Sequence, residues 1–436
     1  MSKSWSSKQP QSIEPFFTLP DDVLIDIFLR LPTKSLIKLR YVCKSWRSFL
    51  SNSNFVRLQL TQSIQKSNPY RVFLNFKYSY YKSSSYHQKY PRWLKSLDYE
   101  QSYALCSGLK PVDAVAQVGD DFNLPVSETS RRFDLLGSCD GLLLIQIQSD
   151  ELLCLWNPST GDFRKIPKSG AKLSNPDDGE ECLAVGLGYD SSIDDYKVVR
   201  VSKSRYGSDR KFEVFNLSGN AWRVIEEKSN CFFGYGRNPI GVYYNGGLYW
   251  LVGGCVLVFI LGGERIGKLA IPSGFHFEEL CVLGGSLAMI CRKKNTENCT
   301  EIWMMDGKGG EDTNWTVSIV IPHSIGSKTL FSPIPMSILR NGDVMIRDLD
   351  RELFVYDRRN NVVNYIVNQR SDKNVEFKAV VYVRSLVNPN IVCSNDSCKE
   401  QKAVGKILEK LKSIKMDDKY KIVKNRLGRL FFPTTS

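Results

Sequence analysis

One plan of strands and turns recurs along most of this chain and limits its possible folds more than any other feature. In each copy a glycine-containing turn leads into an apolar strand, and a polar turn then leads into a second strand. The second strands end near Trp156, Phe215, Phe259, Met304 and Val355, at steps of 59, 44, 45 and 51 residues. Repeats of about 40 to 50 residues with several strands each are typical of β-propeller blades.

A closed ring of blades also explains how so many Val, Ile and Leu residues can stay away from water, since each blade buries its faces on its neighbours. Five blades are readable in the sequence. A sixth is predicted from strands near Arg71–Phe76 and Phe377–Val383, which would close the ring by pairing its two ends. The fold class is therefore mainly β, with a β-propeller-like repeat domain of five to seven blades over residues 71–390. No repeat is assigned to residues 77–125.

The uncharged run from Gly241 to Gly263 is long enough to resemble a membrane span. Gly246-Gly247 and Gly253-Gly254 divide it into short pieces rich in Val, Tyr and Phe. Short apolar pieces between glycine turns indicate buried strands. We therefore expect strands here and no membrane span.

The N-terminal part has a different, helical pattern. Apolar residues recur at helical spacing from Val23 to Leu31, and Pro20 with Asp21 suits the first turn of a helix. Pro32 should end that helix, and Thr33 is predicted to cap the next one. Three short helices with tight joints are expected between residues 15 and 60.

Three short helices cannot hide the dozen large apolar side chains of this segment. The surplus predicts a partner surface. Two partners remain open on the residues alone, a separate protein or the chain's own second domain, against which the helices would form a cap.

The helical segment resembles the F-box motif over residues 17–57. The resemblance rests on Leu19-Pro20, Leu31-Pro32 and the string Val42, Cys43, Lys44, Trp46 and Arg47. It implies docking on a Skp-type adaptor and, through it, a cullin-RING ligase. The residues that would make this contact, or pack behind it, are Leu19, Pro20, Leu24, Ile27, Leu31, Pro32, Leu36, Val42 and Trp46.

Residues 130–385 resemble the F-box-associated, kelch-like domain of plant F-box proteins. The motifs are Gly137–Leu142, Trp156-Asn157-Pro158, Gly186–Asp190 with Asp195–Val199, and Asn245–Trp250. The two resemblances together imply a substrate-recognition subunit of a Skp-cullin-F-box ubiquitin ligase, which bridges a target protein to the adaptor and is not itself an enzyme.

Most motif residues in the repeats also have a structural interpretation, which we prefer. Asp140-Gly141 and Asn157-Pro158 are turn formers, and Trp156, Trp222 and Trp250 are predicted to pack between blades. Target-binding residues are expected instead in connecting segments, because these vary most freely on a rigid scaffold. The candidate segments are Lys203–Lys211, Cys231–Asn238 and Arg292–Asn298.

The net charge of +13 is concentrated at one end. Residues 399–436 hold eleven Lys and Arg against four Asp and Glu, with an apolar stripe from Val404 to Ile414 that predicts an amphipathic helix. The expected organisation is an N-terminal segment 1–14, an F-box 15–60, a linker 61–70, the propeller 71–390 and a basic tail 391–436. A packed helix, nuclear import and attachment to an acidic surface all remain open for the tail.

The N-terminal residues are polar and lack the apolar stretch of a secretion signal, so the expected location is the cytoplasm, the nucleus or both. Scattered single cysteines such as Cys139, Cys154, Cys255, Cys281 and Cys291 fit that compartment as small buried hydrophobic residues.

No catalytic constellation is apparent in the sequence. His87, His276 and His323 lie far apart and in no metal or nucleophile motif, and Cys393 and Cys398 have no second pair that would suggest zinc. No cofactor, nucleic acid or metal is expected. Two alternatives remain open, a propeller scaffold outside any ligase and an unrecognised propeller hydrolase.

Overall fold

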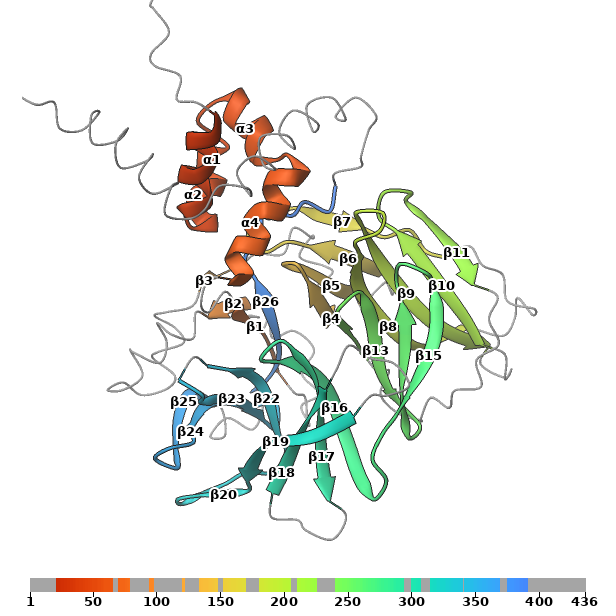
Figure 1. Cartoon of the computed structure of the whole chain (residues 1–436), viewed down its shortest axis with the longest axis vertical. Coiled ribbons are helices and arrows are strands. Elements are labelled where there is room, and N and C mark those ends of the chain that lie inside the picture. The colour runs from red at the N-terminus through yellow and green to blue at the C-terminus, as the bar shows by residue number, and fades with distance from the viewer. Residues whose placement is uncertain are drawn as a thin grey trace, which may run out of the picture. The chain divides into compact units, whose positions relative to one another are not determined.

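The computed structural model describes residues 21–65, 70–78, 94–97, 120–121, 133–147, 152–169, 180–204, 210–225, 240–293, 299–306, 314–339, 341–368 and 375–390. The chain divides into two compact units (Figure 1). One comprises residues 1–59 together with 394–436, and the other comprises residues 60–393. The predicted helix of the basic tail lies outside the described residues.

Four helices follow one another at the N-terminus, where three were expected. They are α1 (Asp21–Arg30), α2 (Thr33–Leu39), α3 (Lys44–Leu50) and α4 (Ser53–Gln65). The first three lie where they were predicted from Leu19-Pro20, Leu31-Pro32 and the Cys-Lys-x-Trp string. The fourth helix includes residues 61–65, where a polar linker was predicted. The linker was predicted because the Gln and Ser residues of this segment carry little apolar periodicity.

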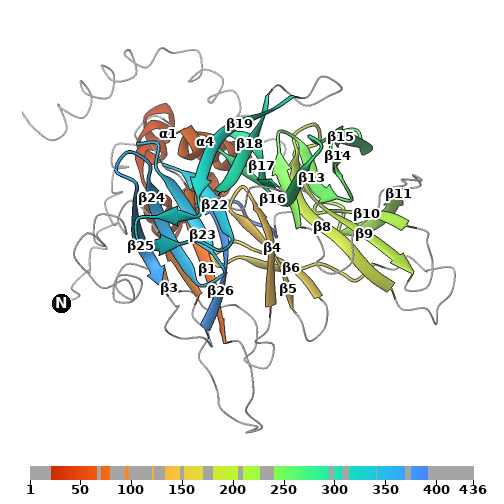
Figure 2. The ribbon, with the colours of Figure 1, turned by 90° about the horizontal axis from the view of Figure 1, so that it is seen from below.

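The remainder is a succession of antiparallel groups of four strands, which we call blades (Figures 1 and 2). The third and fourth groups join into one eight-stranded sheet through a short parallel pairing, with Ile240 opposite Val185 and Gly241 opposite Gly186. Blade 1 contains β26 (Val375–Val383), β1 (Tyr70–Tyr78), β2 (Leu94–Leu97) and β3 (Asp120–Asp121). Blade 2 contains β4 (Phe133–Cys139), β5 (Leu142–Ile147), β6 (Leu152–Trp156) and β7 (Phe163–Lys165). Blade 3 contains β8 (Glu180–Asp190), β9 (Asp195–Ser204), β10 (Arg210–Asn216) and β11 (Ala221–Ile225).

Three further blades complete the described sheets. Blade 4 contains β12 (Ile240–Tyr244), β13 (Gly247–Val252), β14 (Cys255–Ile260) and β15 (Arg265–Ala270). Blade 5 contains β16 (Phe275–Leu283), β17 (Ser286–Lys293), β18 (Cys299–Asp306) and β19 (Asn314–Pro322). Blade 6 contains β22 (Pro333–Ile338), β23 (Val344–Asp348), β24 (Glu352–Asp357) and β25 (Val362–Asn368). A hairpin of β20 (Ser324–Ile325) and β21 (Lys328–Thr329) precedes blade 6.

The ring closes where the two ends of the propeller chain pair. Strand β26 runs antiparallel to β1 over their whole lengths, from Tyr70 opposite Val383 to Tyr78 opposite Val375. The innermost strands of successive blades lie side by side, and β22 of blade 6 lies beside β26 of blade 1. This confirms the predicted sixth blade built from residues at the two ends. It also places β2 and β3, which come from the segment 77–125 where no repeat was assigned.

The apolar run from Gly241 to Gly263 forms β12, β13 and β14 of blade 4, as predicted. Asn245-Gly246 and Gly253-Gly254 make the turns, with φ of 44° and 78° in the first and 44° and 91° in the second. No helix within the described part of the chain has the length and apolar character that a membrane crossing requires.

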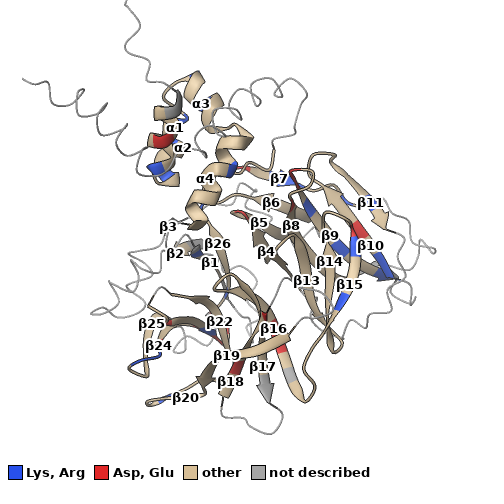
Figure 3. Cartoon of the chain, viewed as in Figure 1, with Lys and Arg blue, Asp and Glu red and all other residues tan. Residues whose placement is uncertain are grey.

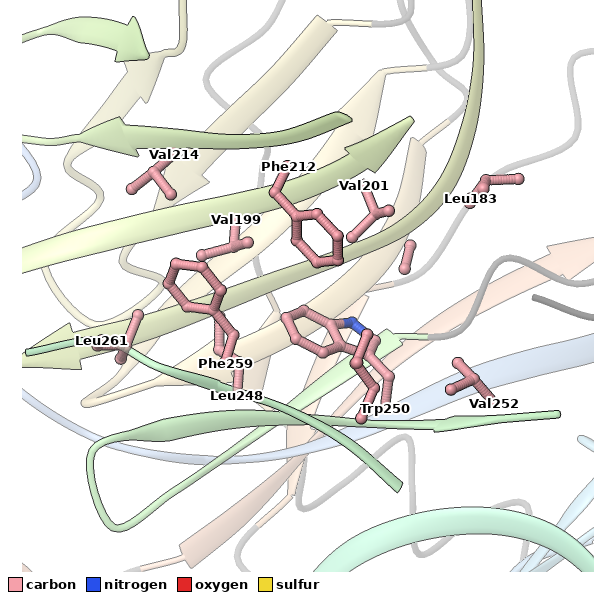
Figure 4. Packing of buried hydrophobic residues seen from close by; sticks show 12 residues of the cluster. Leu183, Val199, Val201, Phe212, Val214, Leu248, Trp250, Val252, Phe259 and Leu261 are labelled. Atoms are coloured by element: carbon pink, nitrogen blue, oxygen red, sulfur yellow. The ribbon is translucent and has the colours of Figure 1, made fainter. Parts of the chain in front are cut away.

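The cores lie between neighbouring blades. Figure 4 shows one of them, in which Val199, Phe212 and Val214 of blade 3 face Leu248, Trp250 and Phe259 of blade 4. All of these side chains are fully buried. The residues that marked the sequence repeat, Trp156, Phe215, Phe259, Met304 and Val355, lie on β6, β10, β14, β18 and β24. Each is thus on the third strand of its blade, which explains why they recur.

Candidate functional site

An aromatic cluster holds the helices of the N-terminal unit together. The ring of Phe28 on α1 meets Trp46 on α3 edge-on, with centroids 5.1 Å apart, and lies 5.9 Å from Phe49 and 6.5 Å from Phe55 on α4. Ile25 of α1 and Leu50 of α3 are also fully buried. Phe28 therefore holds one face of α1 against the helices that follow.

Polar contacts fix the joints between these helices. Thr33 was predicted to cap α2, but it is the first residue of α2 and its hydroxyl accepts a hydrogen bond from Gln59 Nε2 at 3.1 Å. Pro32 stands at the cap position without a side-chain hydrogen bond. Cys43 caps α3 instead, since its sulfur accepts the Trp46 N–H at 3.4 Å. The Cys-Lys-x-Trp string is thus a helix start.

The predicted adaptor-binding residues divide by exposure. Leu36 is fully buried, so it packs behind the surface. Leu24, Ile27, Leu31 and Trp46 are half-buried. Pro32 and Val42 are exposed, and Leu19 and Pro20 lie outside the described residues. Leu24, Ile27 and Leu31 have i, i+3, i+7 spacing, so they share one face of α1 and its end. An apolar stripe that stays half-exposed in the isolated chain is available to a partner.

The joint between α2 and α3 carries the most exposed apolar pair of the unit. Tyr41 is 84% exposed and Val42 is 62% exposed. Val42 was among the predicted contacts, whereas Tyr41 was missed. Its signal was its place directly before the Val-Cys-Lys string, in a joint too short to bury a large ring.

Tryptophan side chains bridge neighbouring blades, as was predicted for Trp156, Trp222 and Trp250. Trp250 Nε1 in blade 4 donates to the Val185 carbonyl of blade 3 at 3.2 Å, and Trp222 Nε1 in blade 3 donates to the Pro167 carbonyl at 2.6 Å. The Trp156 ring meets Phe73 of blade 1 with centroids 5.4 Å apart. Trp315 in blade 5 repeats the device, with Nε1 donating to the Ala270 carbonyl of blade 4 at 3.0 Å.

Blade 2 binds the segment that follows β26. Asn157 is fully buried, and its Nδ2 donates to the carbonyls of Ser385 at 3.2 Å and Val387 at 2.7 Å. Arg164 donates to the Pro389 carbonyl at 2.9 Å. Gly141, with φ of 86°, leaves no room for a side chain, because a Cβ there would lie 2.5 Å from the Val383 carbonyl. Asn157 and Gly141 are turn residues, as predicted, and they also hold the ring closed.

A buried ion cluster joins blades 3 and 4. Lys197 Nζ lies 2.7 Å from Asp190 Oδ2, 2.7 Å from Glu264 Oε1 and 2.9 Å from the Leu261 carbonyl. Burial acts to raise the pKa of Asp190, but hydrogen bonds from Lys197 and Ser192 outweigh it and lower that pKa below its ordinary value. Blade 3 also pairs charges internally, and Figure 3 shows acidic and basic segments side by side on β9 and β10, where Arg200 pairs with Glu213.

Catalytic groups were not expected, and the described residues contain no cluster of His, Cys, Asp and Glu that could hold a metal ion. His323 Nε2 shares a hydrogen bond with Thr300 Oγ1 at 2.8 Å, while His87, Cys393 and Cys398 lie outside the described residues. Cys139, Cys154 and Cys291 are buried as predicted, and Cys255 and Cys281 are half-buried. Burial raises the pKa of the Cys154 thiol to about 12.

The two ends of the ring differ in what they carry. At the closing end, defined by the Tyr70–Val383 pair, β1 begins and β26 finishes. At the opposite end, which we call the loop end, lie the turn 349–351 and the strand ends at Lys165, Glu180, Ser204, Arg210, Ile225, Ile240, Lys293 and Cys299. The strands that flank the three predicted target-binding segments have their neighbouring ends at the loop end, and most residues of those segments lie outside the described part.

Comparison with known proteins bears on both units. The sequence pattern of the F-box associated beta propeller domain matches residues 97–393, which is more than half of the chain. The chain belongs to the F-box associated beta propeller family. The F-box domain pattern matches residues 16–58, which contain α1 to α3. Both resemblances that the sequence suggested are thereby confirmed, together with the mainly β fold.

Relatives of this F-box associated propeller protein come from Arabidopsis thaliana. An F-box/kelch-repeat protein is 26% identical over 387 residues, covering 85% of this chain and 96% of the relative. The F-box protein CPR1 is 25% identical over 352 residues, covering 73% of this chain and 77% of CPR1. Among solved structures, TolB from Acinetobacter baumannii is 11% identical with a TM-score of 0.44, covering 74% of this chain and 72% of TolB, a likeness too weak to bear on the fold.

Proposed function

We propose that this chain is the substrate-recognition subunit of a Skp-cullin-F-box ubiquitin ligase. The helical unit binds a Skp-type adaptor, and the propeller holds a target protein for ubiquitination. In this role the chain is a non-catalytic receptor, and it acts in the cytoplasm, the nucleus or both.

The observation that carries the proposal is the F-box match over residues 16–58 together with the apolar surface that these helices leave exposed. Tyr41 and Val42 face solvent, and Leu24, Ile27 and Leu31 form a half-exposed stripe. Complete burial of such a side chain contributes about 1.5 to 3 kcal/mol. Several of them on one small unit support binding to a separate protein.

The direct test is copurification of the full chain with a Skp-type adaptor. Leu31→Asp and Val42→Asp each place a charge where the partner would exclude water, so each should abolish copurification. Ile64→Asp is the matched control, because Ile64 is 42% exposed on α4 and lies beyond the F-box match. Circular dichroism establishes that the three variants are equally folded.

Undiminished adaptor binding by both variants would remove the support for the proposed contact. A chain that captures no adaptor at all would instead favour the alternative of a propeller scaffold outside any ligase. A ligase role further requires that the wild-type chain lowers the abundance of at least one protein while the Val42→Asp chain raises it by shielding. Quantitative proteomics of cells that produce either chain measures whether the abundance of any one protein falls with the wild type and rises with Val42→Asp.

A further inference from the structure

Two large apolar side chains stand exposed on hydrogen-bonded backbone segments at the loop end of blade 6. Phe331, just before β22, is 55% exposed, and Leu349, in the turn between β23 and β24, is 49% exposed. Asp348 joins them, because Leu349 follows it in the chain and its carboxylate accepts the Phe331 N–H at 3.2 Å. We call Phe331 and Leu349 the blade 6 patch.

The backbone under this patch is held rigidly. Asp348 is fully buried, and its carboxylate also accepts the Ser332 N–H at 2.7 Å. Arg351 N–H donates to the Asp348 carbonyl at 3.2 Å and closes the turn. Two apolar side chains on such a base lose little conformational freedom when a partner binds, which favours affinity.

Leu349 has a backbone conformation that its side chain disfavours. Its φ is 53°, and that of Asp350 is 55°, both in the left-handed region where Gly, Asn and Asp are the usual residues. An exposed leucine at this turn position contributes nothing to the core. Backbone strain that brings no gain in packing is a feature of binding sites.

The charged side chains around the patch are already paired with one another. Arg347 and Lys378 both contact Asp350, the latter at 2.6 Å, and Arg351 lies 3.0 Å from Glu376. The described residues of the rim therefore present no excess of one charge to a ligand. A second copy of this chain is a poor occupant, because two molecules with a net charge of +13 repel each other.

We infer that the blade 6 patch is an anchor point for the target protein, and that its occupant is an uncharged apolar side chain on a segment of that target. The inference rests on the proposed function and adds the place and chemistry of recognition. The patch lies at the same end of the ring as the strand ends that flank the segments predicted to bind the target. The closing end is occupied by the chain's own residues 383–389.

A phage-displayed library of short random peptides, selected on the immobilised full chain, tests this inference. Peptides with Leu, Ile or Phe at one shared position should be enriched. Binding of the synthesised winner should fall roughly tenfold or more in Leu349→Asn and in Phe331→Asp, as expected for the loss of a central anchor. Its affinity should change little between low and high salt, because the rim charges are paired.

Leu349→Asn separates binding from folding. Asn tolerates the left-handed backbone, so the melting temperature of this variant should equal or exceed that of the wild type. Val362→Asp is the matched control, since Val362 is 47% exposed on β25 of the same blade but lies at the closing end. It should bind the peptide as the wild type does.

Failure to enrich apolar peptides, or winners that bind Leu349→Asn and Phe331→Asp undiminished, would overturn the inference. Concentration-dependent dimers that Leu349→Asn abolishes would overturn it as well, by assigning the patch to a second copy. Adaptor copurification is measured separately on the same variants and should be unchanged. If the proposed adaptor binding is wrong, adaptor copurification fails while peptide binding is unchanged. If the inference about the patch is wrong, peptide binding fails while adaptor copurification is unchanged.

Discussion

Asn157 Nδ2 donates a 2.7 Å hydrogen bond to the carbonyl of Val387, 230 residues later in the chain. Asn157 follows directly on β6, and Val387 follows β26, so the bond connects blade 2 to the segment that completes the ring. Because both groups are buried, loss of either leaves the other without water as a replacement partner. Asn157 of the Trp-Asn-Pro motif thus has a structural role beyond the turn.

Gly141→Ala should destabilise the closed ring more than Gly161→Ala does. Both glycines have positive φ, 86° and 79°, so the two changes carry a similar backbone cost. Only at Gly141 does the new Cβ meet other atoms, whereas at Gly161 nothing lies within 4 Å. We expect a further loss of about 1 to 3 kcal/mol at Gly141, typical of overpacking. Urea unfolding measures both, and equal losses would contradict the proposed role of this close approach.

Lys197→Met should reduce the free energy of unfolding by about 3 to 5 kcal/mol at neutral pH, because it leaves Asp190 buried without its cation and leaves Glu264 paired with Arg223 alone. The loss should depend on pH. The folded pKa of Asp190 in the wild type lies below its ordinary value, so its stabilising effect is present above that value and disappears as pH falls through the folded pKa. In the variant, burial raises the pKa of Asp190. Acidification should therefore reduce the difference in free energy of unfolding between the wild type and the variant. A gap independent of pH would argue against the ion cluster.

Cys43 should react with iodoacetamide in the folded chain, while Cys154 and Cys291 should not. Cys43 is exposed, and burial raises the pKa of Cys154 and of Cys291 to about 12. The thiolate is the reactive form, and Cys154 and Cys291 hold very little of it at neutral pH. A folded pKa above the ordinary 9.0 gives stability that is complete below pH 9.0 and is lost as pH rises toward 12. Mass spectrometry of labelled peptides, with and without denaturant, checks the order of reaction.

Trp250→Phe should cost about 1 to 2 kcal/mol, although Phe keeps most of the apolar surface. The change removes the N–H that donates to the Val185 carbonyl and leaves that carbonyl buried without this donor. Trp303→Phe is the control, because Trp303 also packs in a core between blades but its Nε1 donates at 3.2 Å to the Glu301 carboxylate of its own strand. Thermal unfolding compares the two, and a smaller loss in Trp250→Phe than in Trp303→Phe would contradict the bridging role.

The blades were predictable because their signal is repeated and strong. Trp156, Phe215 and Phe259 stand on the same strand of successive blades, so one packing requirement recurs in the sequence. The pairing of Arg71–Phe76 with Phe377–Val383 was also accessible, since a ring has to cover both of its free strands. By contrast, β2 and β3 are short, and Asp120-Asp121 has no apolar residue that would reveal a strand.

The candidate site was only partly predictable, because residue type does not report exposure. Leu36 and Leu31 look alike in the apolar pattern, yet Leu36 is fully buried and Leu31 is half-buried. Thr33 has the composition of a cap, but its hydroxyl accepts from Gln59, 26 residues later, which no local pattern reveals. The blade 6 patch was missed for the same reason, since Phe331 and Leu349 read as ordinary core residues until Asp348 is seen to join them.

The pairing of β1 with β26 determines when this protein can finish folding during its synthesis. The ribosome makes β1 early, but one edge of that strand gains its partner only after residue 383 has been translated and has left the exit tunnel. Until then the nascent chain exposes an unpaired apolar strand, which chaperones recognise and which other nascent chains can pair with. A chain that stops before residue 375 can never cover this edge. We therefore expect such products to aggregate or to stay bound to chaperones, because the strand pair that closes the complete ring is missing.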